Sequence, residues 1–184
     1  MRVIEADDIV TSIADALQFV SFYHPVDFVQ ALKDAYRDET SAAAKNALLQ
    51  LLINSKLSAQ AHRPVCQDTG VAHVYLKIGM DVRVQGKVGM PTPTYQALAN
   101  LGVAKAYLCA QNPLRASIIS QPLGSRANTG DNTPAVIHYE IVPGDDVEVI
   151  CAAKGGGSEN KAKMVMLNPS DSIVDWVLKT VPTM

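Results

Sequence analysis

The stretch Arg63-Pro64-Val65-Cys66-Gln67-Asp68-Thr69-Gly70 divides the chain into two parts with different hydrophobic periods. Before it, apolar residues recur every three or four positions, as in amphipathic helices, and after it they recur at every second position, as in a half-buried strand. Pro64 cannot continue a helix, and Gly70 can leave the loop with a positive φ. The stretch is therefore predicted to be the loop at which a helical part of the chain meets a sheet.

Reactive side chains are concentrated in this loop. Cys66, Gln67 and Asp68 place a thiol, an amide and a carboxylate in consecutive positions. A thiolate can hold iron or zinc, and a carboxylate can carry a proton or orient a substrate. An ordinary polar turn is the alternative, because Asp, Thr and Gly also gather in turns that have no chemical role.

Working outward, the pattern predicts helices over residues 4–20 and 28–36, and a third that starts after Thr40 or Ser41 and fades near His62. Strands are predicted over residues 71–78 and 82–84, followed by a helix over 95–110 capped near Thr94 and ended by Pro113. Residues 135–142 and 147–152 are predicted to form a β-hairpin around the turn at 143–146. A last helix follows the cap signal at residues 168–171 and leaves an apolar face without an evident partner.

These elements predict a mixed α/β (α+β) fold, with N-terminal helices followed by a small β-sheet with packed helices. At 184 residues the chain is expected to be one unit, mainly helical over residues 1–62 and mixed over residues 63–184. A chain of this length buries about 70% of its unfolded surface and needs no disulfide or metal merely to fold.

Composition excludes several classes of function. Charged residues make up 18% of the chain and the formal net charge is −2, so there is no basic field for nucleic acid. The acidic start differs from a signal peptide, and no apolar run approaches the ~18 residues of a membrane span. We expect a cytoplasmic protein that binds neither membrane nor nucleic acid.

The three cysteines follow no known structural spacing. Cys66, Cys109 and Cys151 are separated by 43 and 42 residues, which matches neither a disulfide framework nor a zinc site. Cys109 and Cys151 have apolar neighbours and are assigned to packing. Only Cys66 is a candidate metal ligand.

Two further polar loops are candidates for ligand binding. One covers residues 124–134 and contains Asn128-Thr129-Gly130; the other covers residues 154–161 and reads Lys-Gly-Gly-Gly-Ser-Glu-Asn-Lys. Three consecutive glycines let backbone amides approach an anion closely. The second loop is neither a dinucleotide fingerprint nor a P-loop, which would end in Gly-Lys-Ser/Thr.

Together, Cys66-Gln67-Asp68-Thr69-Gly70, the Asn128-Thr129-Gly130 loop and the glycine-rich loop resemble, in this order and spacing, the class I iron–sulfur fumarate hydratases and the related L-tartrate dehydratases. The resemblance covers most of the chain, and the residues after the triple glycine are more similar to the fumarases. It implies a hydro-lyase that reversibly hydrates fumarate to malate, a reaction of the tricarboxylic acid cycle.

The resemblance also implies roles for individual residues. Cys66 would be one of three thiolates that hold a 4Fe-4S cluster with an open iron. Gln67, Asp68, Arg115 and the backbone amide of Gly157 would bind a dicarboxylate, and Asp68 would belong to the catalytic proton network. Arginine suits such a substrate because its guanidinium makes charge-assisted bonds to carboxylates.

One departure from the family pattern limits what these residues can do alone. The other two cluster cysteines are expected beyond residue 184, and neither Cys109 nor Cys151 matches them. The chain is therefore expected to be an N-terminal fragment of a larger catalytic α domain, inactive and without a cluster by itself. Its expected partners are the remaining α segment, a β domain or subunit, and a second copy in a homodimer.

Three other functions are compatible with parts of the pattern. An L-tartrate dehydratase-type hydro-lyase would use the same loops, and a complete non-catalytic binding or assembly module would use none of their chemistry. Asp68-Thr69-Gly70 is also the active-site triplet of aspartic proteases. The helical N-terminal part and the flanking Cys66 and Gln67 argue against a protease.

Overall fold

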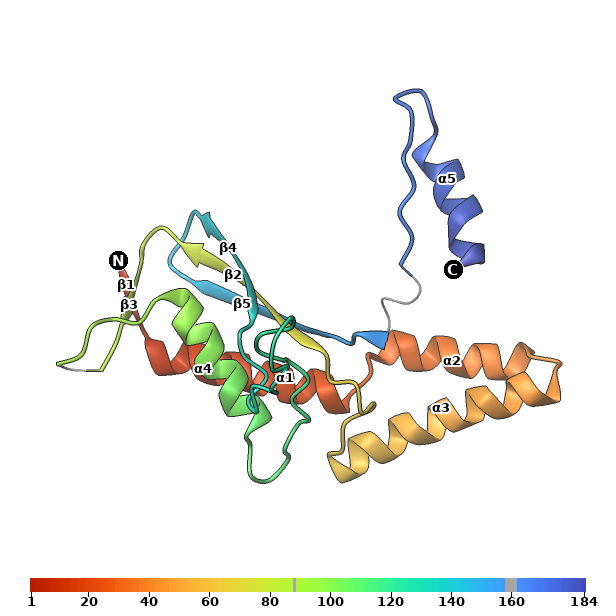
Figure 1. Ribbon diagram of the computed structural model, residues 1–184, viewed down its shortest axis with the longest axis horizontal. Helices are drawn as coiled ribbons and strands as arrows, with labels where there is room; N and C mark the ends of the chain where they lie inside the picture. Colours follow the sequence, from red (N-terminus) through yellow and green to blue (C-terminus); the bar gives the residue numbers. More distant parts are fainter. Residues whose placement is uncertain (88, 158–161) are drawn as a thin grey trace.

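The computed structural model describes residues 1–87, 89–157 and 162–184 and has the expected mixed α/β fold (Figure 1). In chain order the elements are β1 (Arg2–Glu5), α1 (Ala6–Phe22), α2 (Val26–Asp38), α3 (Ala42–Ala61), β2 (Val71–Gly79), β3 (Val82–Gln85), α4 (Tyr95–Tyr107), β4 (Val136–Val142), β5 (Val147–Lys154), α5 (Ile173–Thr180) and the 3₁₀ turn η2 (Val181–Thr183). Three helices precede most of the strands, as the sequence predicts, and the short strand β1 before them is an addition to that prediction.

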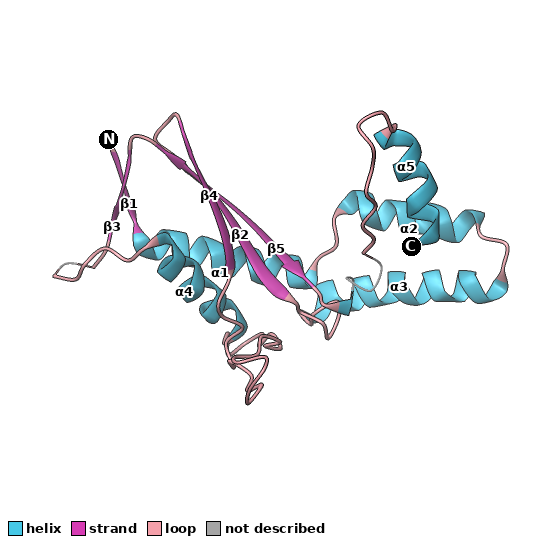
Figure 2. Cartoon of the chain, turned by 45° about the horizontal axis from the view of Figure 1, so that its top comes forward, coloured by secondary structure: helices cyan, strands magenta, loops and turns pink. Residues whose placement is uncertain are grey.

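The core lies between a three-stranded sheet and two helices, α1 and α4 (Figure 2). β2 is the central strand, and its alternate residues Ala72, Val74, Leu76 and Ile78 are at most 3% exposed. This alternation confirms the strand face predicted from the sequence. The helices cover that face with a further set of buried side chains, namely Ile9, Ile13, Leu17, Leu98 and Val103.

A glycine lets α1 and α4 approach closely. A Cβ on Gly102 of α4 would lie 2.7 Å from the Cβ of Ile13 on α1, closer than two carbon atoms can pack. Ile13 is fully buried. The close contact between the two helices therefore requires glycine at position 102, although glycine has a low intrinsic helix propensity.

The predicted β-hairpin between β4 and β5 is wrong. The strand order is β4-β2-β5, with β2 parallel to β4 and antiparallel to β5. β2 carries the most buried strand face and takes the centre, where both of its edges are paired. The turn at 143–146 crosses the end of β2 instead, and Gly79 and Asp81 donate backbone hydrogen bonds of 2.9 Å to Asp146 and Gly144.

Two helix boundaries also differ from the prediction. Residues 2–5 form β1, which pairs in parallel with β3, so α1 begins at Ala6 rather than within the predicted start at residue 4. A local sequence pattern does not reveal pairing with a strand that lies far along the chain. α4 ends at Tyr107, before the predicted 110, because the chain folds back and the Leu114 amide donates to the Tyr107 carbonyl.

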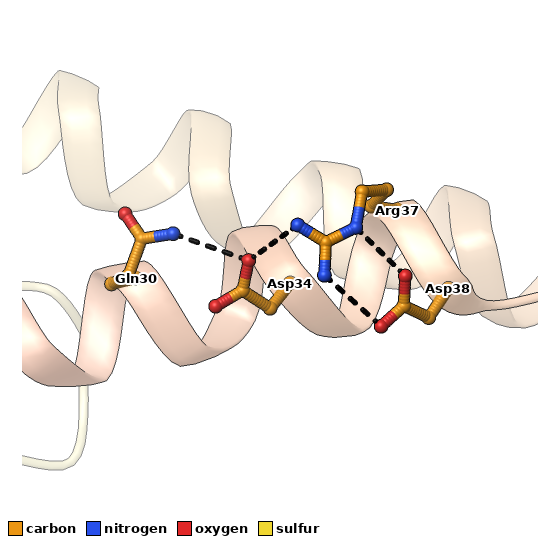
Figure 3. A network of polar contacts seen from close by, with 4 residues as sticks. All are labelled: Gln30, Asp34, Arg37 and Asp38. Atoms are coloured by element: carbon orange, nitrogen blue, oxygen red, sulfur yellow. Dashed lines mark hydrogen bonds and ion pairs between the residues drawn. The ribbon is translucent and has the colours of Figure 1, made fainter.

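Helices α2 and α3 form a hairpin that extends away from the core (Figures 1 and 2). Both were predicted, and the Ser41 hydroxyl caps α3 by accepting from the Ala44 amide. No residue of α2 is buried. Its polar face is instead linked by side-chain contacts one to four residues apart, among Gln30, Asp34, Arg37 and Asp38 (Figure 3).

The C-terminal helix α5 stands apart from the other helices in Figure 1. The Ser172 hydroxyl caps it, close to the predicted signal, and no residue of α5 is buried. Four of its apolar side chains are between 52% and 70% exposed, at Ile173, Val174, Val177 and Leu178. The predicted uncovered apolar face is therefore confirmed. Within the described ranges, no helix has the length and apolar character needed to cross a membrane.

Candidate functional site

Three loops meet at one edge of the central sheet because of its strand directions. The loop of residues 66–70 enters β2 there, residues 131–135 enter the parallel strand β4, and the glycine-rich segment leaves the antiparallel strand β5. Val71 faces Lys154, and His73 faces both Val136 and Ala152. The polar segments that the sequence singled out separately are thus brought together by register.

The loop of residues 66–70 passes from an exposed beginning to a buried end. Cys66 and Gln67 are exposed, Asp68 is half-buried, and Thr69 and Gly70 are buried. Gly70 has φ +69°, and a Cβ there would overlap the carbonyl group of Lys154. Its lack of a side chain lets the loop pass directly against the end of β5.

This close approach places Asp68 against the glycine-rich loop. Its Oδ2 atom accepts a hydrogen bond of 2.8 Å from the backbone N–H of Gly157. A Cβ on Gly155 would lie 2.8 Å from the same oxygen, so this glycine leaves room for the carboxylate. Two predicted site residues, Asp68 and Gly157, are therefore in direct contact. The remainder of the motif, residues 158–161, lies outside the described part of the chain.

Arg115 also contacts the loop of residues 66–70. Its Nη1 donates a 3.2 Å hydrogen bond to the carbonyl oxygen of Gln67. The Thr69 hydroxyl in turn donates to the carbonyl oxygen of Arg115. Arg115 and Gln67 are exposed, so a guanidinium and an amide are accessible beside the Asp68 carboxylate. Such a set can bind and orient a small molecule that carries carboxylates.

Two buried residues support the loop and were not predicted from the sequence. The hydroxyl of Tyr107, at the end of α4, donates a 3.0 Å hydrogen bond to the Thr69 carbonyl. Burial raises the pKa of Tyr107 and is the main effect on this hydroxyl; the side chain of Thr69 acts in the opposite direction. Asn132 is fully buried and bonds both to Gly70 and to the segment after Arg115. The only sequence signal for Asn132 is its place in a polar loop before Thr133-Pro134.

The neighbouring Asp131 stays ionised at lower pH than a free aspartate. Burial by itself acts to raise its pKa, but hydrogen bonds from the backbone N–H and hydroxyl of Thr133 outweigh it, so the pKa is lowered. The two bonds are 3.0 and 2.7 Å long. Asp131 therefore acts as a fixed turn-forming acceptor beside Asn132.

The three cysteines have different surroundings. Cys66 is exposed; its thiol donates to the Gln67 side-chain oxygen and accepts from the Asp68 amide, each at 3.4 Å. Cys151 packs against the core from β5, as predicted. Cys109 is a correction to the predicted packing role, because it follows the end of α4, is partly exposed and bonds to Gln111.

The described residues provide only some of the ligands that a metal cluster needs. Among the residues that the structure describes, no three His, Cys, Asp or Glu side chains gather closely enough to hold a metal ion. The exposed thiol of Cys66 fits one ligand position. The described residues do not fit a complete cluster site by themselves.

The partly buried thiol of Cys151 should make stability fall at alkaline pH. Burial raises its pKa from 9.0 to about 11, so the unfolded chain loses this proton first. The contribution is fully present below pH 9 and is lost between pH 9 and 11. Because the thiol is partly exposed and screened by solvent, the loss stays below about 1.4 kcal/mol per pH unit. Urea unfolding of wild type and Cys151→Val across this range should show a steeper fall for wild type. Parallel curves would contradict the assignment.

Comparison with known protein families places most of this chain within one of them. The model of the fumarate hydratase (Fumerase) family matches residues 10–184. A Methanocaldococcus jannaschii protein named provisionally as an L(+)-tartrate dehydratase subunit alpha is 32% identical over 176 residues, which cover 92% of this chain and 59% of that protein.

Two Escherichia coli proteins are also similar. The aerobic class I fumarate hydratase of strain K12 is 40% identical over 135 residues, covering 72% of this chain but 23% of that enzyme. The L(+)-tartrate dehydratase subunit alpha of an O157:H7 strain is 28% identical over 176 residues, covering 94% of this chain and 55% of that subunit. The chain thus spans less than two thirds of the length of each of these relatives.

Proposed function

Because this chain belongs to the fumarate hydratase family, we propose that it forms the N-terminal part of the α domain of a hydro-lyase that reversibly hydrates fumarate to malate. The similarity to a class I fumarate hydratase supports the reaction. The convergence of the three loops supports the site, because strand register brings polar segments that are far apart in sequence to the same end of the sheet.

The observation that carries the proposal is the hydrogen bond from Gly157 to Asp68, with Arg115 bonded to the same loop. In the proposed site, Arg115 pairs with a substrate carboxylate and the Gln67 amide offers a further donor. Asp68 holds or moves a proton at its carboxylate, and the hydrogen bond from the Gly157 N–H orients that carboxylate. All these groups are presented by loops that a packed sheet holds in place, as is common for binding and catalytic residues.

We propose that a 4Fe-4S cluster completes this site in the whole protein, with Cys66 as the ligand from this chain. Such a cluster supplies a Lewis acid when it is bound. Since the described residues offer one ligand position, the others would come from the remaining α segment. A β domain or subunit and a second copy of the enzyme are further proposed partners, in a cytoplasmic homodimer of the tricarboxylic acid cycle.

An L-tartrate dehydratase is the second candidate. It is favoured by one observation, that the two tartrate dehydratase alpha subunits match more than nine tenths of this chain. Fumarate hydration and tartrate dehydration both require binding of a dicarboxylate, so the geometry of Asp68 and Arg115 serves either.

Paired assays on the complete, anaerobically prepared protein should separate these functions. We expect loss of the fumarate double-bond absorbance and formation of malate, with L-tartrate dehydrated at least ~10-fold less efficiently, because a site tuned to hydrogen-bonding groups of one substrate discriminates against another. Faster turnover of L-tartrate would favour the second candidate. Turnover of neither compound by protein with its cluster present would reject both and favour the assembly module.

A further inference from the structure

We propose that Asn132 is a positioning residue that sets the separation between the acidic and the cationic sides of this site. Asp68 lies on the loop of residues 66–70, and Arg115 lies on the segment of residues 114–118. Asn132 comes from a third segment, immediately before β4, and contacts both. The inference rests on the proposed function only in its reference to substrate.

The side chain of Asn132 joins the two segments through backbone groups. Its Oδ1 accepts from the amides of Ser117, at 2.6 Å, and Ile118, at 3.2 Å. Its Nδ2 donates to the Gly70 carbonyl oxygen at 2.9 Å. One side-chain amide thus holds Gly70, two positions after Asp68, to Ser117 and Ile118, which follow Arg115 by two and three positions.

Only a carboxamide in one orientation satisfies these partners. Two backbone N–H groups require an acceptor, and the Gly70 carbonyl requires a donor. Turning the amide over would place donors against donors and an acceptor against an acceptor. Asn132 also has φ 62°, a left-handed conformation that asparagine tolerates better than most residues. Residue type and backbone geometry therefore agree at this position.

Burial makes the loss of any of these hydrogen bonds costly. Asn132 is 0% exposed, so water cannot replace a lost partner without rearrangement. Neighbouring hydrogen bonds also join these segments: the Thr69 hydroxyl donates to the Arg115 carbonyl, and the Tyr107 hydroxyl donates to the Thr69 carbonyl. A shift of about 1 Å between groups that orient a substrate can lower a rate about 10²-fold. Asn132 is thus placed to control the site without touching substrate.

Asn132→Asp is the informative substitution because it keeps the shape of the side chain. Its carboxylate still accepts from Ser117 and Ile118, but it has no donor for Gly70 and places a negative oxygen against that carbonyl. We therefore expect the loop of residues 66–70 to loosen while residues 117–118 stay bonded. Asn132→Ala removes all three bonds and should loosen both segments. Asn46→Asp, on the exposed face of α3, is the matched control.

Hydrogen–deuterium exchange on the chain itself tests the linkage without any turnover. In Asn132→Asp, amides of residues 66–70 should exchange about tenfold faster than in wild type, with β2 and β4 unchanged. In Asn132→Ala, Ser117 and Ile118 should also accelerate. Equal acceleration across all strands would show general destabilisation and overturn the proposal, as would exchange identical to that of Asn46→Asp.

Steady-state kinetics on the complete enzyme test the consequence for substrate. Asn132→Asp should raise KM for fumarate about tenfold and lower kcat/KM about 10²-fold. A purely structural role would reduce the amount of active enzyme and leave KM unchanged, which would overturn the positioning role. If the complete protein hydrates no dicarboxylate, the proposed function fails, and the exchange experiment still decides whether Asn132 sets the loop position.

Discussion

Asp68→Asn in the complete, cluster-loaded enzyme is expected to lower kcat for fumarate hydration by about 10²- to 10⁴-fold, the usual contribution of a positioned proton-transferring group. Asparagine keeps the size of the side chain, and its carbonyl oxygen can still accept the 2.8 Å hydrogen bond from Gly157. It lacks the charge and the ability to carry a proton. The loss should therefore fall mainly on kcat rather than on the folded state.

A matched variant separates this effect from the removal of any carboxylate. Asp145 lies in the turn at 143–146, at the opposite end of β2 from the loop of residues 66–70. Asp145→Asn makes the same chemical change roughly 30 Å away, the length of a nine-residue strand at about 3.3 Å per residue. We expect it to retain wild-type kcat. Full activity of Asp68→Asn enzyme with an intact cluster would remove Asp68 from the proton network.

Gly70→Ala should be strongly destabilising, lowering the free energy of unfolding by about 4 kcal/mol or more. Two penalties add at this position. The φ of +69° strains any residue with a Cβ, and that Cβ would overlap the Lys154 carbonyl group. The overlap involves backbone at the end of β5, which cannot rotate aside as a flexible side chain would.

Gly130→Ala isolates the first of these penalties. Gly130 has φ +82°, and a Cβ there would meet nothing within 4 Å. It should cost about 1–2 kcal/mol, the strain of a left-handed conformation alone. Urea unfolding of the two variants and wild type gives both values. Equal destabilisation of the two variants would mean that the approach of the loop to β5 is not tight.

Much of the fold was predictable because its signals are local. Alternation along residues 71–78 identified β2, and the Ser41 and Thr94 caps located the starts of α3 and α4. The pairing of strands was not predictable in this way. A four-residue turn between residues 142 and 147 is as compatible with a hairpin as with a crossing over β2. The burial of β2 by α1 and α4 decides between them.

In the candidate site, too, the residue types were predictable from the sequence, whereas the contacts between them were not. The sequence by itself determined the reactive residues Cys66, Gln67 and Asp68 and the need for a flexible backbone at Gly70, because residue chemistry and φ preference are properties of single positions. Only the tertiary structure decided that Asp68 meets Gly157 and that Asn132 joins two loops. These contacts depend on strand order and register, which arise from burial of the whole sheet face rather than from any short stretch of the chain.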